Sequence, residues 1–338
     1  MRLFEPETYC GRCPFKAECR PLNSNVSCPP EWDRSLPGGP STSHPADLVT
    51  LAEIRSFGGV SLNTSWKPLP VPKIEMPGYV PQPRFRASYR GWLKEDNYII
   101  RLNEILRKGQ LLTAAEVRDK IGLDENQHLH LILFDKDERL EKLWFRGSDG
   151  AQDLANAGYT SISAPSFSTY WPRTRTEYLI NVRRSQIYFA ALQMAGANAI
   201  PRVAWGTKND AARFSEWANR NPAIEMFSLD LSTYNEPADW KTQMEGLFTF
   251  DRLTGGSHQY LINGPSKASR FLDIFNATSP DRVHLTNATS QKRINPRRLR
   301  STGDQAGPTF EERIQTQRAP LERATSSYWA SIAESEAA

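Results

Sequence analysis

The stretch AIPRVAWGTKNDAARFSEWANRNPAIEMFSLD, from Ala199 to Asp230, decides the fold class. It holds two short apolar runs, at residues 199–205 and 224–229, on either side of an amphipathic segment at 210–220. Each run is too short for a buried helix and is bounded by Gly, Pro, Asn or Asp, which is typical of buried strands. A strand, a helix and a second strand in this order predict a right-handed βαβ unit of a parallel sheet.

The same alternation continues on both sides of this stretch. Further short apolar runs predict strands at residues 129–134, 159–163, 259–262 and 283–285. Helical spacing between the runs predicts helices at residues 177–195, 239–250 and 267–275. Additional strands are expected upstream, for example at Gly59–Leu62. The chain is therefore expected to be an α/β protein with a parallel βα repeat that resembles a TIM barrel, and an open doubly wound sheet is the alternative.

Upstream of this repeat the sequence predicts two helices and an extended segment. Residues 96–108 have helical spacing, and a short helix is predicted to begin at Thr113, with Glu116 at the capping-box position. Residues 66–84 contain six prolines, which argue against a regular helix or a central strand. We expect this segment to be extended and to pack on the main domain through its apolar side chains.

The composition along the chain predicts four parts. They are a metal-binding segment with four cysteines at 1–30, a Pro-rich linker at 31–90, the α/β barrel-like domain at 91–290 and a basic, disordered tail at 291–338.

Polar residues follow several of the predicted strands. In parallel α/β folds the carboxyl ends of the strands form the working face, so these residues are expected to converge. The predicted site residues are Ser166, Ser168, Tyr170, Lys208, Asp230 and Asn263. Asp230 is expected to act as a base or nucleophile, Lys208 to hold an anion and Asn263 to orient a substrate amide.

Helix capping is the alternative explanation for polar residues at these places. Helix N-caps are expected near Ser166, Asp210 and Ser266. An N-cap side chain accepts a backbone hydrogen bond, so capping explains a polar residue at these places without any catalytic role.

Three short motifs in this region carry a resemblance. SAPSFSTY at 163–170, NVRRS at 181–185 and GANAIPRVAW at 196–205 resemble the domain-of-unknown-function 4417 family of bacteria and their phages, over roughly residues 125 to 290. That family has no assigned function, so the resemblance implies no activity. The cysteine segment and the basic tail lie outside it.

All four cysteines of the 338 residues lie near the N-terminus, at Cys10, Cys13, Cys19 and Cys28. The spacing C-x2-C-x5-C-x8-C favours a metal centre, either an iron–sulfur cluster of the 4Fe–4S type or zinc. Part of it is similar to the cluster-binding C-x2-C-x5-C segment of CRISPR-associated and recombination-type nucleases, whose first cysteine lies far upstream. Two disulfides are the third reading, but the N-terminus shows no apolar signal-peptide region, so a cytoplasmic, reducing location is expected.

The net charge of +4 is concentrated near the C-terminus, where residues 280–323 contain nine Lys or Arg against five acids. A basic cluster there is a candidate for binding nucleic-acid phosphates, and it consists of Lys292, Arg293, Arg297, Arg298 and Arg300. A solvated tail is the alternative.

Several protein classes are excluded or disfavoured. The chain has no P-loop motif, no H-E-x-x-H or G-x-S-x-G motif, and no apolar stretch long enough to span a membrane. His128 and His130 share one face of a predicted strand, where they could bind a metal or form hydrogen bonds. Two functions remain: an enzyme with a metal centre that acts on nucleic acid or a nucleotide, or a noncatalytic phage or mobile-element protein that binds DNA or another protein.

Overall fold

The protein consists of alternating strands and helices. The structure, a computed structural model, describes residues 61–64, 66–83, 93–107, 110–169, 175–287 and 310–337. The elements in chain order are β1 (Asn97–Arg101), α3 (Leu102–Ile105), β2 (Leu106–Arg107), β3 (Gln110–Leu111), α4 (Ala114–Ile121), β4 (His128–Ile132), α5 (Asp137–Phe145), α6 (Gly147–Asn156), β5 (Ser161–Ser163), α7 (Arg175–Met194), β6 (Ala199–Ile200), α8 (Lys208–Arg220), β7 (Met226–Asp230), α9 (Pro237–Leu253), β8 (Gln259–Asn263), α10 (Ala268–Ala277), the 3-10 turn η3 (Pro280–Arg282), β9 (Val283–Thr286) and α13 (Phe310–Ala337).

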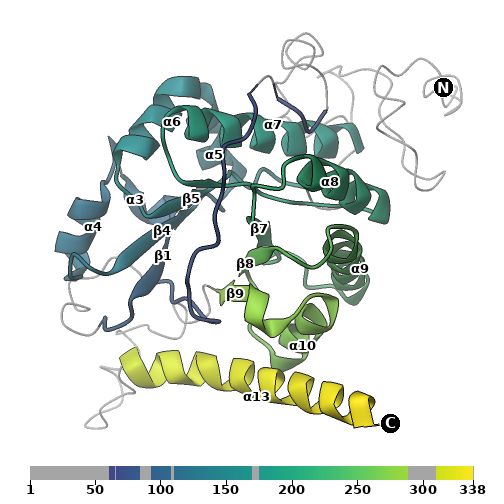
Figure 1. The fold of residues 1–338 in the computed structure, drawn as a ribbon. Coiled ribbons are helices and arrows are strands. Elements are labelled where there is room, and N and C mark those ends of the chain that lie inside the picture. The colour runs from purple at the N-terminus through teal and green to yellow at the C-terminus, as the bar shows by residue number, and fades with distance from the viewer. Residues whose placement is uncertain are drawn as a thin grey trace, which may run out of the picture.

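Two parallel sheets form the centre of the molecule. One has the strand order β1-β4-β5-β6 and the other β7-β8-β9, and helices lie outside the strands (Figure 1). Every pairing in both sheets is parallel. The predicted α/β class with alternating βα units is therefore confirmed, and the strands that the sequence indicated correspond to β4 through β9.

Backbone hydrogen bonds connect the two sheets on both sides. Beyond β6, an isolated parallel bridge joins Arg202 to Ser228 of β7, and Ser228 N donates to Pro201 O at 2.9 Å. Beyond β9, Leu285 N donates to Gly78 O at 2.7 Å. Residues 78–81 thus lie between β9 and β1, because Ile99 N of β1 donates to Pro81 O at 2.9 Å. All four sheet edges are hydrogen-bonded.

Residues 78–81 form no regular strand, as the prolines predict, but they pair with β9 through the isolated bridge between Tyr79 and Leu285 and hydrogen-bond to β1. Proline lacks only the N–H, and this pairing uses groups that the prolines leave intact. Val80 N donates to Leu285 O at 2.8 Å, and the carbonyls of Gly78 and Pro81 accept. The expected packing of the segment is present, since Val71 and Val80 are fully buried.

The helix expected at residues 96–108 is also wrong. Residues 97–101 form β1, followed by the single turn α3 and the start of a hairpin, β2–β3. Tyr98, Ile99 and Ile100 are all fully buried, although they point to opposite faces. A continuous apolar run of this kind belongs to a parallel strand covered on both faces, and it also satisfies helical spacing. Ser61 and Leu62, the described part of the suggested upstream strand, are not in a strand.

Helix α4 begins as the sequence predicts. The Thr113 hydroxyl accepts from Glu116 N, and the Glu116 carboxylate accepts from Thr113 N at 2.7 Å, which completes the capping box. Gly122 ends the helix in the left-handed conformation, with φ of 71°.

The expectation of a disordered C-terminal tail is wrong for residues 310–337, which form helix α13. This helix lies along α10 (Figure 1), where the Tyr328 and Phe275 rings meet edge to face at 6.3 Å. Arg318 forms an ion pair with Glu95 at 2.5 Å. Apolar packing on α10 therefore compensates for the polar composition that suggested disorder. Neither α13 nor any other described helix is both long and apolar enough to cross a membrane.

A tight contact between α9 and the chain after β6 fixes one side of the core. The fully buried Trp205 indole donates to Gln243 O at 3.0 Å and stacks on Phe250 at 6.0 Å. The ring lies directly over Gly246, where an added Cβ would come within 2.2 Å of it. Glycine is required at this helix position because any side chain would displace the indole.

We expect Gly246→Ala to lower the free energy of unfolding by about 1–3 kcal/mol, despite the higher helix propensity of alanine, because overpacking must move Trp205. Urea denaturation would measure the loss. Lys241→Ala on the exposed face of the same helix is the control and should leave stability within about 0.5 kcal/mol of the wild type. A Gly246→Ala protein as stable as the wild type would show that the indole has room to shift.

Candidate functional site

Polar side chains meet at the carboxyl ends of neighbouring strands. Asp230, Asn263 and Thr286 are the last residues of β7, β8 and β9, and they are register partners in turn. Register partners in a parallel sheet point to the same face. Gln82, which follows the paired segment 78–81, extends its side chain to Asn263 from the other side of β9. Gln82, Asn263 and Thr286 are buried, and Asp230 is half-buried.

A chain of hydrogen bonds fixes the Asp230 carboxylate. Gln82 Nε2 donates to Asn263 Oδ1 at 2.9 Å, and Asn263 Nδ2 donates to Asp230 Oδ1 at 2.9 Å. The backbone N–H of Ser232 donates to the same Oδ1 at 3.0 Å. Among the described residues, Oδ2 accepts a long hydrogen bond of 3.4 Å from the Ser166 hydroxyl. One carboxylate oxygen is therefore held by two donors, while the other remains weakly bound.

A buried cation lies beside this carboxylate. Arg202 is 4% exposed, and its Nη2 donates to Thr169 Oγ1 at 2.9 Å. Burial lowers the pKa of Arg202, and the nearby Tyr234 and Asp230 act in the opposite direction. Arginine nevertheless stays charged in proteins. Burial also raises the pKa of Tyr234, so its phenol stays protonated at neutral pH.

Several buried polar atoms around the strand ends have no hydrogen-bond partner within the described ranges. They are Gln82 Oε1, Arg202 Nε, Thr286 Oγ1, Arg101 Nε and Asp135 Oδ2. Arg101 ends β1, and Asp135 closely follows β4, so these atoms come from several strand ends. A buried polar atom without a partner costs about 1–3 kcal/mol. Such a cluster is typical of a site completed by a bound polar molecule.

A second buried arginine holds the neighbouring helices together. Arg184 of α7 is fully buried and forms a bidentate pair with Glu141 of α5, with Nη1 to Oε1 at 2.7 Å. Its guanidinium lies over the faces of Trp144 and Phe167, at 4.7 and 4.0 Å from their centroids, in the corner that these two perpendicular rings form. Asn181 Oδ1 accepts from it at 3.2 Å. The charge is thus neutralised, hydrogen-bonded and in contact with two aromatic faces.

This arrangement positions the loop between β5 and α7. Asn181 Nδ2 donates to Ser168 O at 2.7 Å, and the Ser185 hydroxyl donates to Pro165 O at 2.7 Å. In the same loop, the Ser166 hydroxyl donates to Asp230, and the Thr169 hydroxyl accepts from Arg202. The motif residues of α7 therefore act as anchors of a site loop and do not themselves reach the strand-end cluster.

Of the site residues predicted from the sequence, Asp230, Asn263 and Ser166 meet in space. Lys208 does not join them, because its side chain is 66% exposed and its ammonium pairs with Glu245 at 3.3 Å. Ser168 contributes backbone groups, with its N–H donating to Asp137 Oδ1 at 3.1 Å. Tyr170 lies outside the described residues.

None of Ser166, Asp210 and Ser266 is a helix N-cap, since α7 begins at Arg175 and α10 has Lys267 as its N-cap. Thr207 is the N-cap of α8, and Asp210 Oδ2 accepts from Gly206 N at 3.1 Å. Asp210 therefore has a structural role at the start of that helix. The Ser166 hydroxyl instead points to Asp230.

Sequence reasoning missed Gln82, Arg202 and Thr286. Arg202 had a signal, because it is the one charged residue within the apolar run 199–205. Gln82 stands between two prolines and Thr286 ends a short strand, and neither pattern suggests a site.

Of the two histidines of β4, His128 is exposed and His130 is buried. A neutral His130 satisfies both of its contacts, with Nε2 donating to Asn97 Oδ1 at 3.0 Å and Nδ1 accepting from the Ser161 hydroxyl at 2.9 Å. Burial, with smaller contributions from His128 and His284, lowers the pKa of His130 to about 3.

The described residues contain no group of three or more His, Cys, Asp or Glu side chains that could hold a metal. Cys10, Cys13, Cys19 and Cys28 lie outside the described residues.

Comparisons with known proteins identify no family. No protein-family model and no curated protein matches the chain. Among solved structures, one described as "Native KDPGal structure" is 13% identical, with 76% of this chain and 98% of that chain covered and a TM-score of 0.38. A designed cube-shaped, highly porous protein cage is 12% identical over 76% of this chain and 75% of that chain, also with a TM-score of 0.38. Values this low carry no functional argument.

We expect the protein to lose stability as the pH falls below about 6.5, the ordinary histidine pKa. Burial lowers the pKa values of His130, His258 and His284, so the unfolded chain binds more protons in this range. Each such histidine contributes a slope of about 1.4 kcal/mol per pH unit between its two pKa values. Urea denaturation between pH 7 and pH 4 would measure it.

His130→Asn should reduce this slope, because the substituted side chain does not titrate. The matched control is Ser161→Ala, which removes a hydrogen bond from the same ring and should lower stability similarly at every pH. Equal slopes for His130→Asn and the wild type would contradict the assignment.

Proposed function

We propose that the chain forms a closed parallel βα barrel. The hydrogen bonds at all four sheet edges support this, because an open doubly wound sheet would leave two edges unpaired. With residues 78–81 and the chain near Arg202 included, the ring would have the succession of parallel strands that such barrels use. The carboxyl-end cluster would then occupy the usual position of a barrel active site.

We propose further that the protein is an enzyme that binds a small anionic substrate, such as a nucleotide, at these strand ends. One observation carries this proposal: a charged, hydrogen-bonded cluster of Arg202, Asp230, Asn263 and Gln82 includes buried polar atoms without partners. Structural polar clusters normally satisfy their own hydrogen bonds. A ligand with both acceptors and donors would complete this one.

The arrangement suggests a division of roles. Asp230 Oδ2 would accept a proton from a bound hydroxyl or water, while Oδ1 stays fixed by Asn263 and Ser232. The guanidinium of Arg202 would stabilise negative charge on the substrate, more strongly than at the surface because it is buried. The protonated Tyr234 phenol could donate a hydrogen bond to the same charge.

Asp230→Asn tests these roles. The variant should fold, because the amide oxygen can still accept from Asn263, but turnover should fall by roughly 100-fold or more. Affinity for inorganic phosphate or nucleoside monophosphates should rise several-fold, because a negative charge beside Arg202 is removed. Thermal-shift assays and calorimetry with inorganic phosphate and a panel of nucleoside monophosphates would measure affinity. Incubation of the protein with nucleotides, followed by detection of the released product, would measure turnover.

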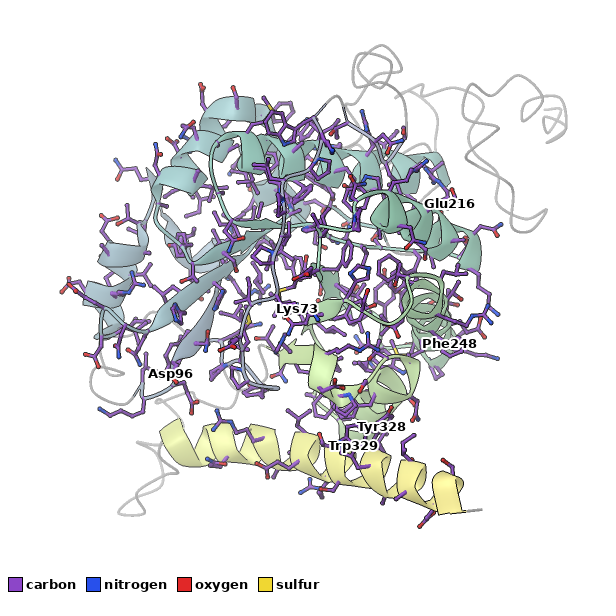
Figure 2. The ribbon with its side chains drawn as sticks, in the orientation of Figure 1. Lys73, Asp96, Glu216, Phe248, Tyr328 and Trp329 are labelled. Atoms are coloured by element: carbon purple, nitrogen blue, oxygen red, sulfur yellow. The ribbon has the colours of Figure 1, made fainter. Side chains whose placement is uncertain are left out.

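The control for the lost charge is Glu216→Gln, exposed on α8 and remote from the strand ends (Figure 2), which should change neither quantity. Unchanged turnover in Asp230→Asn would make Asp230 a structural residue. If no anion in the panel binds the wild type, the proposal of an enzyme is wrong and the noncatalytic alternative takes its place.

Two predictions rest on the sequence alone and stay predictions. They are nucleic-acid binding by the basic cluster at 292–300 and a cytoplasmic location.

We also propose that the four N-terminal cysteines bind an iron–sulfur cluster or zinc, on the strength of their spacing. Protein purified without oxygen should be brown with absorption near 400 nm if the centre is a cluster, or colourless with stoichiometric zinc. Replacing Cys10 and Cys13 with serine should remove the metal in either case. A wild-type protein with neither metal would exclude both readings.

A further inference from the structure

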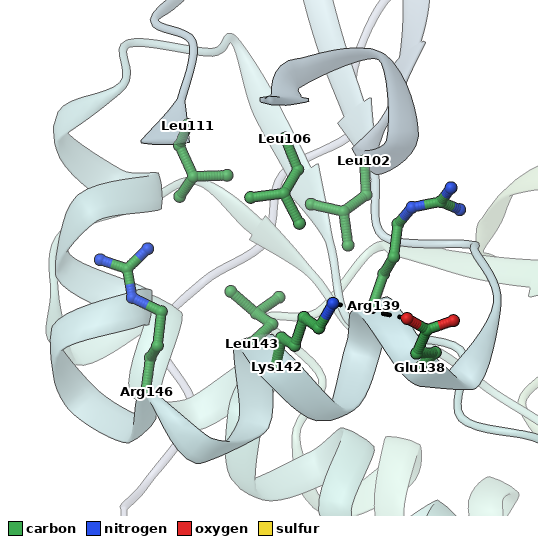
Figure 3. Close-up of a pocket in the computed structure, with 8 residues that line it drawn as sticks. All are labelled: Leu102, Leu106, Leu111, Glu138, Arg139, Lys142, Leu143 and Arg146. Carbon is green, nitrogen blue, oxygen red and sulfur yellow. Dashed lines mark hydrogen bonds and ion pairs between the residues drawn. The ribbon is translucent and has the colours of Figure 1, made fainter. Parts of the chain in front are cut away.

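A cavity of about 430 Å³ lies between the β2–β3 hairpin and helix α5 (Figure 3). Its volume falls in the range of small-molecule sites. Leu102, in its wall, directly follows the last residue of β1, and α5 begins shortly after β4 ends. The cavity therefore stands at the carboxyl-end side of the two strands, and the ion pair of Arg139 with Asp135 connects its wall to the strand ends.

The inner wall of the cavity is apolar. Leu106 and Leu111 reach into it from the two strands of the hairpin, opposite Leu143 of α5 (Figure 3). Leu143 is buried, whereas Leu106 and Leu111 are only partly buried and keep some surface towards the cavity. Apolar surface left in a concave site favours binding of an apolar group, because burying it removes it from water.

The opposite rim is basic. Arg139 and Lys142 of α5 and Arg146, the residue directly after it, are three and four residues apart and so lie on one side of the helix, next to the leucines (Figure 3). Lys142 pairs with Glu138 at 3.4 Å, and both side chains are strongly exposed. Arg139 and Arg146 pair with Asp135 and Asp153, and both arginines remain more than a third exposed. The pairs of Lys142 and Arg146 are exposed on both sides and therefore weak, so these two cations can rearrange towards an anion, whereas Arg139 pairs with the buried Asp135 carboxylate and stays in place.

From this combination we propose that the cavity binds an amphipathic organic anion. The apolar body would lie against Leu106, Leu111 and Leu143, and the acidic head group, a carboxylate or a phosphate, would lie among Arg139, Lys142 and Arg146. Lys142 and Arg146 would supply the contacts to the head group, because their present partners, Glu138 and Asp153, are exposed and can separate from them. The proposal does not depend on catalysis at the strand ends.

The proposed ligand needs both an acidic head group and an apolar body. Calorimetry on the full-length protein with three probes tests these two requirements separately. Octanoate should bind with one site per chain. Octanol lacks the charge and acetate lacks the apolar body, so each should bind at least about tenfold more weakly. Equal binding of octanol and octanoate, or several octanoate molecules per chain, would overturn the proposal.

Two variants place the binding in this cavity. Lys142→Gln should weaken octanoate binding about fivefold, while Lys241→Gln, which removes a lysine from an equivalent i,i+4 pair on α9, should have no effect. Leu111→Gln should weaken octanoate and octanol alike, with circular dichroism to confirm folding. Octanoate binding that is the same in Lys142→Gln, Leu111→Gln and the wild type would show that the ligand sits elsewhere and that the proposal is wrong.

Discussion

The pairing of residues 78–81 with β9 on one side and β1 on the other is the contact on which the rest of the architecture depends. Without it, Leu285 and Ile99 would each leave a buried backbone N–H without an acceptor. The same segment carries Gln82 to the end of β8, where it fixes the amide of Asn263 and through it the Asp230 carboxylate. The order of the strands and the geometry of the candidate site therefore have a common origin.

The loop after β5 shows how burial of a charge can serve a neighbouring site. Arg184 is costly to bury, and the cost is offset by Glu141, by two aromatic faces and by an amide oxygen. The result is a rigid platform under the loop that presents Ser166 and Thr169. In this anchor one buried atom, Arg184 Nε, has no hydrogen-bond partner among the described residues, whereas in the strand-end cluster Gln82 Oε1, Arg202 Nε and Thr286 Oγ1 have none. The anchor therefore satisfies most of its own hydrogen bonds, and the strand-end cluster leaves more of them open to a ligand.

Much of the fold could be predicted from the sequence, because short apolar runs bounded by Gly, Pro and Asn indicated β4 through β9 and the helices between them. The predictions failed where one pattern fits two structures. The run Tyr98–Ile100 satisfies helical spacing as well as a doubly covered strand, and the prolines near Tyr79 concealed a pairing that needs few donors. For the site, strand-end position found Asp230 and Asn263, but it could not show that the Lys208 side chain turns outward to Glu245. Side-chain direction at the first turn of a helix is set by neighbours that sequence does not reveal.

The position of the segment before β1 also bears on how the chain folds. Pro77 O accepts from His284 Nδ1 across 207 residues of sequence, and Gly78 lies against Leu321 of α13, within 3.4 Å of an ideal Cβ. Contacts over such separations form late, since the entropy of closing so long a loop must be overcome first. During synthesis, residues 78–81 can pair with β1 early, but their other edge would stay unpaired until β9 has left the ribosome. The nascent protein is therefore most vulnerable to wrong strand pairing just before β9 emerges.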